Sequence, residues 1–225
     1  MAERFVRRIP EPTVLRLPVY YRALAALSAD STTTVSSAEL AVAAGVNAAK
    51  VRKDLSHLGT YGTPGTGYDV NFLLGQIRRE LGLDREWPVL IVGMGNLGHA
   101  LARSQRFSTQ NFRTFALFDI DPAKIGEHVT GMPIRHVSEL AEVANGQRGL
   151  IGVIATPACS AQQACDQLVG AGIEAILNFA PVILRVPRPV QVRRVDFSVE
   201  LQVLAFYAVH PEVTATPEED PQSEL

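Results

Sequence analysis

The sequence predicts an α/β protein in two parts, a winged helix-turn-helix domain followed by a doubly wound parallel sheet. Three observations support this prediction. Residues 1–84 contain short amphipathic helices and a glycine-rich loop, whereas short apolar strands alternate with helices from Val89 onward. The first of these strands ends in Gly93-x-Gly95-x-x-Gly98, a pattern typical of a Rossmann nucleotide-binding domain.

The N-terminal part begins with three predicted helices. Residues 12–27 carry apolar side chains at helical spacing, starting after Pro12. Ser36 to Glu39 matches a capping box for the next helix, which ends at Gly45. Asn47 is a natural N-cap for a third helix over 48–58, and "STTTV" before the capping box is interpreted as a loop.

The second and third of these helices fit a helix-turn-helix. Ala41 is small where the helices cross, Gly45 opens the turn, and Val46 and Val51 pack the pair together. The third helix then exposes polar and basic side chains suited to phosphates and base edges, namely Lys50, Arg52, Lys53, Ser56 and His57. The same charges also fit the solvated face of an ordinary three-helix bundle.

Residues 59–70, "GTYGTPGTGYDV", predict a tight β-hairpin placed like a wing, with Tyr61, Tyr68 and Val70 as strand residues around the turn. Tyr61, Gly67 and Tyr68 are the candidate DNA contacts there. Residues 72–83 form another amphipathic helix, and "DREWP" at 84–88 is the best domain boundary.

The C-terminal part alternates strand and helix. The strands are "VLIVG", "TFALFD", "LIGVIAT" and "EAILNFA", with helices at 97–105, 137–144 and 160–171, which favours a parallel sheet. "VQVRRVDF" is a late strand. The segment 198–210 is apolar on nearly all sides, so this helix requires more than one packing surface and suits a partner subunit.

The glycine fingerprint has the context that nucleotide binding needs. A strand precedes it, a helix follows, and Asp119 ends the next strand 21 residues after Gly98. The helix start supplies N–H groups to the pyrophosphate, and Asp119 accepts the ribose hydroxyls and repels a 2′-phosphate. We therefore expect NAD(H) rather than NADP(H); the alternative is a set of turn and packing glycines.

Composition narrows the class of protein. Hydrophobic residues make up 47% and charged residues 20% of the chain, and no apolar run reaches the roughly 20 residues of a membrane span. No signal-peptide pattern is present, which predicts a cytoplasmic protein. Residues 1–86 hold 11 basic against 9 acidic side chains, and residues 87–225 hold 10 against 14, so a polyanion is expected at the N-terminal part.

A catalytic set is not evident. A nicotinamide dehydrogenase needs a His, Lys or Tyr beside the reacting carbon, but no lysine follows Leu150 and His210 lies outside the predicted sheet. We expect no catalytic residues and no metal site. Cys159 and Cys165 lie six residues apart on a predicted helix and are interpreted as small buried hydrophobes rather than a redox pair.

The chain resembles the Rex family of redox-sensing repressors over residues 10–208. The most specific pieces are "KVRKDLSHLGTYGTPGTGY", "VGMGNLGHAL", "FDIDP", "ILNFAPV" and "VDF". The resemblance implies a homodimer with the last helix swapped into the partner, and a palindromic double-stranded operator. That operator is bound without ligand or with NAD+ and released when NADH binds.

The resemblance also implies roles for particular residues. The cofactor is expected to contact the fingerprint and later loops, through Gly93, Gly95, Asn96, Leu97, Gly98, Asp119, Ile120, Thr156, Pro157, Asn178 and Phe179. Phe197 of the partner would reach the nicotinamide, and Arg16 would couple the N-terminal domain to Asp196. Two departures stand out: Ser104 replaces a tyrosine common in the family, and Pro64 replaces a usually basic wing residue.

We therefore divide the chain into a DNA-binding domain (1–84), an NAD(H)-binding domain (85–197), a dimerisation helix (198–210) and a tail (211–225), whose acidic, proline-containing composition predicts disorder. Two other functions stay open at this point. A dehydrogenase would use the Rossmann part alone, and a CoA-type nucleotide binder would require no effect of NADH on DNA.

Overall fold

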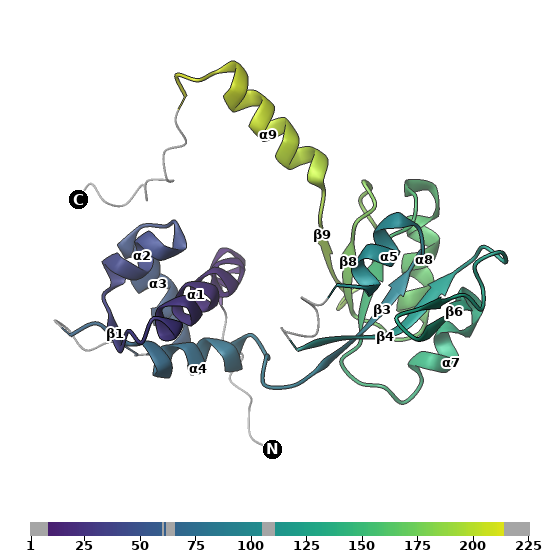
Figure 1. The fold of residues 1–225 in the computed structure, drawn as a ribbon, viewed down its shortest axis with the longest axis horizontal. Coiled ribbons are helices and arrows are strands. Elements are labelled where there is room, and N and C mark those ends of the chain that lie inside the picture. The colour runs from purple at the N-terminus through teal and green to yellow at the C-terminus, as the bar shows by residue number, and fades with distance from the viewer. Residues whose placement is uncertain (1–8, 60, 62–65, 105–110, 214–225) are drawn as a thin grey trace. The chain divides into compact units, whose positions relative to one another are not determined.

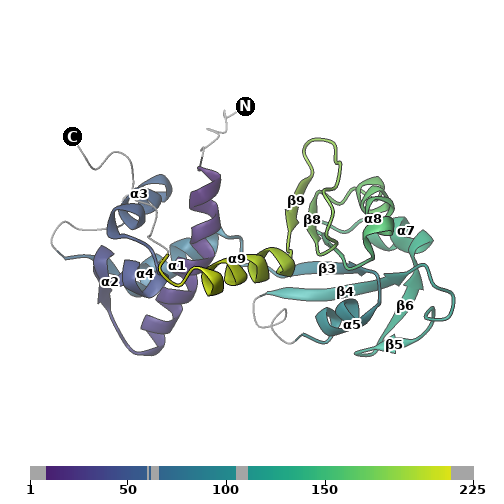
Figure 2. The same cartoon turned by 90° about the horizontal axis from the view of Figure 1, so that it is seen from above.

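The computed structural model describes residues 9–59, 61, 66–104 and 111–213, and its chain divides into two compact units. The first unit ends at Asp84 and the second begins at Arg85 (Figures 1 and 2). Residues 214–225 of the predicted acidic tail, the wing residue Pro64, and residues 105–110 after Ser104 lie outside the described residues. Within the described part, no helix is long and apolar enough to cross a membrane.

The first unit is built from four helices and a short ladder: α1 (Glu11–Ala29), β1 (Thr34–Val35), α2 (Ser37–Ala44), α3 (Ala48–Leu58), β2 (Tyr68–Asp69) and α4 (Val70–Glu80). The predicted capping box is confirmed, since Ser36 Oγ accepts from Glu39 N and Glu39 Oε2 accepts from Ser36 N. Gly45 ends α2 in the left-handed conformation at φ 67°. Asn47 Oδ1 accepts from Lys50 N at 2.7 Å and starts α3 as predicted.

The predicted hairpin over 59–70 is wrong in its strand pairing. The partner of Tyr68 is Val35, in the segment predicted to be a loop, and the two-residue strands are antiparallel. Tyr61 lies outside any strand, and its hydroxyl donates to the Leu58 carbonyl at 2.8 Å. Val70 begins α4 rather than extending a strand, because Asp69 Oδ1 accepts from Phe72 N and turns the chain into a helix.

The second unit contains a seven-stranded sheet in the order β5-β6-β4-β3-β7-β8-β9. Its elements are β3 (Trp87–Val92), α5 (Asn96–Ala102), β4 (Phe112–Asp119), β5 (His128–Val129), β6 (Met132–His136), the short turn η1 (Val137–Glu139), α7 (Leu140–Ala144), β7 (Ile151–Ile154), α8 (Ala158–Gly170), β8 (Ala175–Asn178), β9 (Gln191–Arg194) and α9 (Phe197–Val209). All neighbours are parallel except β5 and β6.

This order confirms the parallel α/β sheet and adds two details. From β3 the chain builds outward through β4 and β6, then returns to place β7, β8 and β9 on the other side, so β3 and β7 flank the point where direction reverses. The β5–β6 hairpin was not predicted. The late strand is shorter than predicted, because Asp196 caps α9 and Phe197 is already helical.

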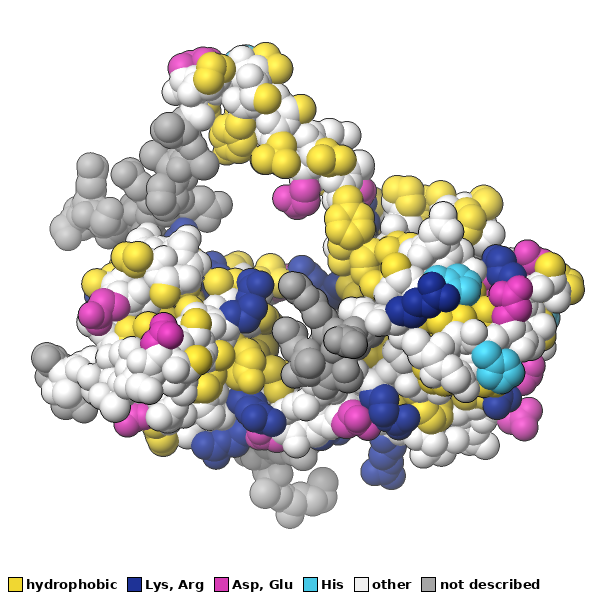
Figure 3. All heavy atoms as spheres, in the orientation of Figure 1, with side chains coloured by type: hydrophobic (Ala, Val, Ile, Leu, Met, Phe, Trp, Pro, Cys, Tyr) yellow, Lys and Arg dark blue, Asp and Glu magenta, His cyan; other side chains and the backbone are white. Residues whose placement is uncertain are grey.

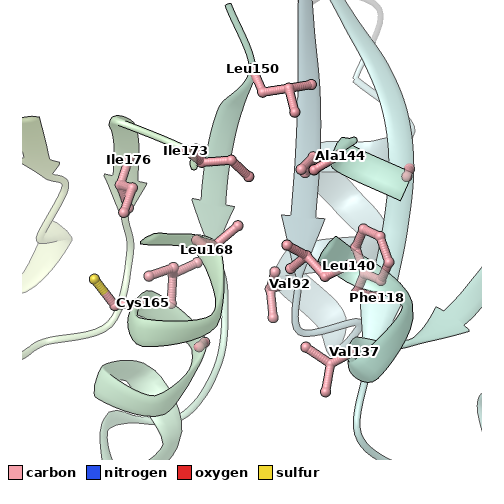
Figure 4. Packing of buried hydrophobic residues seen from close by; sticks show 14 of the residues in the cluster. Val92, Phe118, Val137, Leu140, Ala144, Leu150, Cys165, Leu168, Ile173 and Ile176 are labelled. Atoms are coloured by element: carbon pink, nitrogen blue, oxygen red, sulfur yellow. The ribbon is translucent and has the colours of Figure 1, made fainter. Parts of the chain in front are cut away.

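Both faces of the central strand β3 are buried. Val92 packs on one face with Leu140 of α7 and Leu168 of α8 (Figure 4), and Leu90 belongs to the same cluster. Val89 and Ile91 belong to a separate cluster on the other face. Neighbouring strand residues point to opposite faces, so a strand covered on both sides is a continuous apolar run. This explains the unbroken sequence "VLIV".

Two exposed features of the second unit stand apart from its buried core. Cys165 is buried among the core side chains, but Cys159 at the start of α8 is exposed, so the buried interpretation is wrong for Cys159. Helix α9 buries none of its side chains, and hydrophobic groups are spread over its surface (Figure 3).

Candidate functional site

The three fingerprint glycines have different surroundings. A Cβ at Gly93 would lie 2.8 Å from the Ala155 carbonyl, and one at Gly98 would lie 2.0 Å from Gly93 O. These two positions therefore exclude a side chain because the backbone packs against them. A Cβ at Gly95 would meet no atom within 4 Å. Gly95 thus borders open space at the point where α5 begins.

Asp119 connects the end of β4 to the fingerprint loop. Its Oδ2 accepts from Met94 N at 2.7 Å and from Lys124 Nζ at 3.0 Å, and its Oδ1 accepts from Asp121 N at 2.9 Å. Burial disfavours the charged carboxylate, but these hydrogen bonds outweigh it and hold the pKa of Asp119 below its ordinary value. Asp119 is therefore ionised at neutral pH.

A cleft of about 330 Å³ opens between the fingerprint, the end of β4 and α8. It brings together six of the predicted contacts: Gly93, Gly95, Asp119, Ile120, Thr156 and Pro157. It also contains polar side chains that the sequence patterns did not single out, which are Asp121, Lys124, Ser160, Gln163 and Gln167. Lys124 follows the acid by five residues, and no sequence signal used above distinguishes it.

The cleft suits a phosphorylated nucleotide on its own geometry. The first N–H groups of a helix lack partners within the helix, and no side chain caps α5. Thr156 lines the cleft, and its Oγ1 is buried without a hydrogen-bond partner among the described residues. A buried hydroxyl without a partner is costly, so a ligand atom that bonds to it would be favoured.

The predicted nicotinamide residues lie apart from this cleft lining. Asn178 is buried, and both donors of its amide are used, because they bond to Ala180 O and Val182 O, while its oxygen accepts from Ala180 N. It shapes the loop after β8. The ring of Phe179 stacks on that of Phe197 in the same chain with centroids 6.3 Å apart, and Phe197 is 61% exposed.

Helix α3 presents the predicted DNA-reading side chains. Val51, Leu55 and Leu58 are buried on one face. Arg52, Lys53 and Ser56 are exposed, whereas Lys50 and His57 are partly buried. The Arg52 guanidinium donates to Ser37 Oγ at 3.1 Å, and Ser56 Oγ donates to Lys53 O. The basic face therefore stands on a helix whose other face is fixed in a core.

Asp54 in α3 is buried and binds four donors from α1. Its Oδ1 accepts from Thr13 Oγ1 at 2.7 Å and from the terminal guanidinium nitrogen of Arg16 at 2.8 Å. Its Oδ2 accepts from Arg16 Nε at 2.6 Å and from Tyr20 Oη at 2.7 Å. Burial opposes ionisation of Asp54, but bonds from Arg16, Tyr20 and Thr13 hold its pKa below the ordinary value. We call Thr13, Arg16, Tyr20 and Asp54 the Asp54 cluster.

The three predicted coupling residues have local roles in the described chain. Arg16 belongs to the Asp54 cluster. Asp196 caps α9, since its Oδ1 accepts from Ser198 N and Ser198 Oγ. Ser104 follows α5, and its N–H donates to Leu101 O at 3.0 Å. Across residues 9–59, 61, 66–104 and 111–213, no group of three His, Cys, Asp or Glu side chains is placed to hold a metal.

Comparison with known proteins matches two family models to separate parts of the chain. A model of the CoA binding domain matches residues 84–182, and one of a putative DNA-binding protein N-terminus matches residues 8–56. The redox-sensing transcriptional repressor Rex of Streptomyces avermitilis is 60% identical over 201 residues, covering 89% of this chain and 80% of that protein.

Two solved structures are similar over 91% of this chain. RSP, a Rex-family repressor, in complex with β-NAD+ and operator DNA has a TM-score of 0.84 at 34% identity, over 94% of its own chain. RSP in complex with β-NADH has a TM-score of 0.80 at 33% identity, over 95% of its own chain.

Proposed function

Since the chain belongs to the Rex family of redox-sensing transcriptional repressors, we propose that it binds a palindromic operator without ligand or with NAD+ and releases it when NADH binds. It is a regulator and not an enzyme. The observation that carries the proposal is the presence, in one chain, of an exposed basic face on helix α3 and a cleft of about 330 Å³ beside Asp119. We also propose that it acts in the cytoplasm, where operator DNA would be found.

The cofactor we assign to the cleft is NAD(H). Gly95 and the first N–H groups of α5, at Asn96 and Leu97, would bind the pyrophosphate, and Asp119 would accept a ribose hydroxyl. The Thr156 hydroxyl would gain a partner. When bound, the cofactor would report the redox state through the charge of its nicotinamide ring, which is cationic when oxidised and neutral when reduced. Pro157 and Phe179 are the residues we assign to the ring, together with Phe197 of the partner subunit.

A second copy of the chain is the partner we assign to α9. Every side chain of α9 is unburied, including Leu201 at 65% and Leu204 at 63% exposure. A helix that is apolar all round is stable only when it is covered. Exchange of α9 between two copies would cover it and give a homodimer, whose two-fold symmetry matches a palindromic operator.

DNA contacts are assigned to the exposed face of α3, with Tyr61, Gly67 and Tyr68 in the segment that follows it. Two α3 helices must enter major grooves one turn apart, about 34–36 Å. A ligand moves that spacing only if it binds one arrangement of the dimer better than the other. NADH and NAD+ must therefore differ in affinity for the DNA-bound arrangement.

The test is binding of the purified full chain to a labelled inverted-repeat operator at one stated salt concentration, because phosphate contacts make the affinity depend on salt. NADH, NAD+ and CoA are titrated separately, and a scrambled operator is the control. Release by NADH alone supports the proposal. Release by CoA alone favours the nucleotide class named by the matching domain model, and binding that no ligand changes contradicts the proposed switch.

A further inference from the structure

We propose that Lys124 is the residue that sets the preference between NADH and NADPH, by contacting the ribose of the adenosine together with Asp119. The inference rests on the proposed binding of NAD(H) in the cleft. It differs from the expectation drawn from the sequence, in which Asp119 alone accepts the ribose hydroxyls and repels a 2′-phosphate.

The carboxylate of Asp119 is largely used within the protein. A carboxylate offers about four acceptor positions. Three are occupied, by Met94 N, Asp121 N and Lys124 Nζ. The remaining position is on Oδ1, and Asp119 is only 6% exposed. Asp119 can therefore accept one ribose hydroxyl but cannot by itself bind two.

Lys124 is placed to supply the second contact. Its Nζ lies 3.0 Å from Asp119 Oδ2 and 3.9 Å from Asp121 Oδ2, and its side chain is 33% exposed. It also lines the cleft. An ammonium group carries three donors, and Asp119 uses one of them. A ribose hydroxyl at this point can therefore donate to Asp119 Oδ1 and accept from Lys124.

Asp119 and Lys124 together also determine how strongly a 2′-phosphate on the ribose would be repelled. The exclusion of NADP(H) by an acid depends on an unneutralised negative charge beside the ribose. Here Lys124 offsets one of the two charges of Asp119 and Asp121, and it offers a cation to a phosphate. Repulsion of NADPH is consequently weaker than the acid alone would produce.

The experiment measures NADH and NADPH affinity of the full chain by fluorescence titration, with weak ligands measured by competition against NADH. In Lys124→Met we expect the affinity for NADPH to fall at least about tenfold more than the affinity for NADH. The reason is that the 2′-phosphate then lies beside two uncompensated carboxylates. Asp121→Asn should have the opposite effect and raise the affinity for NADPH relative to that for NADH. Arg113→Met, which removes an exposed cation that pairs with Glu86 outside the cleft, is the matched control and should leave the ratio unchanged.

The outcomes separate the two proposals. If neither dinucleotide binds the wild-type chain, the proposed function fails. If NADH binds and neither Lys124→Met nor Asp121→Asn changes the affinity ratio by more than about twofold, which is about 0.4 kcal/mol, the role of Lys124 is overturned. NADPH binding that is too weak to measure in the wild type and in Asp121→Asn also overturns it.

Discussion

Asp54 in the first unit and Asp119 in the second are both buried carboxylates with a lowered pKa, yet they differ in what their oxygens contact. Asp54 accepts four hydrogen bonds, all from side chains of α1. Asp119 accepts three hydrogen bonds, and its remaining acceptor position borders a cleft. A saturated carboxylate holds two helices together, whereas an unsaturated one beside a cleft is available to a ligand.

The comparison predicts opposite results when each acid is changed. Loss of Asp54 should cost stability of the first unit, and loss of Asp119 should cost ligand binding. Trp87 is the single tryptophan and lies in the second unit, so its fluorescence follows that unit, while far-ultraviolet circular dichroism follows both. The two signals allow each effect to be assigned.

The largest effect is expected for Asp54→Ala. Removing one partner of a buried ion pair typically costs about 3–5 kcal/mol, and here Arg16, Tyr20 and Thr13 all lose their acceptor. Urea unfolding followed by circular dichroism should show this loss, with the Trp87 transition unchanged. The control Asp84→Ala removes an exposed pair with Arg78 and should change stability by less than about 1 kcal/mol. A similar small change for Asp54→Ala would contradict the role of the cluster.

A smaller effect is expected for Tyr20→Phe. It removes one hydrogen bond to the charged Asp54, which is worth about 1.5–3 kcal/mol, and leaves the ring in the core. Because Asp54 has a lowered pKa in the folded state, its contribution is present above its unfolded pKa of about 3.9 and is lost as pH falls through the folded value. Loss of the Tyr20 donor raises that folded pKa.

Urea unfolding of Tyr20→Phe between pH 7 and pH 3 tests this sign. The variant should begin to lose stability at a higher pH than the wild type does. Tyr21→Phe, at the neighbouring position, is the control and should follow the wild-type pH profile. Identical profiles for all three proteins would show that Tyr20 does not stabilise the Asp54 carboxylate.

The smallest effect on stability is expected for Asp119→Asn. The shape is retained and the Met94 N–H can still find an oxygen, so we expect a loss of about 1 kcal/mol. NADH affinity should fall at least about tenfold, or about 1.4 kcal/mol, because the charged acceptor beside the cleft is gone. Asp54→Asn is the matched variant, and we expect it to lower stability more than Asp119→Asn does and to leave NADH affinity nearly unchanged. Unchanged NADH affinity in Asp119→Asn would remove the distinction between the two acids.

Local rules predicted the parts of the fold that depend on neighbouring residues. The capping box at Ser36 and the left-handed Gly45 need only a few adjacent residues, and both are as expected. Gly98 is explained in the same way, because a Cβ there would meet Gly93 O within the same strand–turn–helix, whereas Gly93 is constrained by Ala155, which follows the distant strand β7. Alternating apolar runs were sufficient for the parallel sheet.

Contacts between distant segments were missed. The pairing of Val35 with Tyr68 joins strands of two residues each, too short to show any periodicity. Asp54 was passed over as part of a charged helix, although its spacing from Val51 and Leu58 places it on the buried face. Lys124 has no local signal at all, since its importance comes from the loop that returns it to Asp119.

Helix α9 has a consequence for how the repressor would respond to its own abundance. With every side chain of α9 uncovered in the single chain, the proposed dimer is the state in which this apolar surface leaves water. The stability of such a dimer rises with protomer concentration. Dilution would then separate the two DNA-reading helices, as the proposed ligand switch would, so the amount of protein in the cell would become a second input to repression.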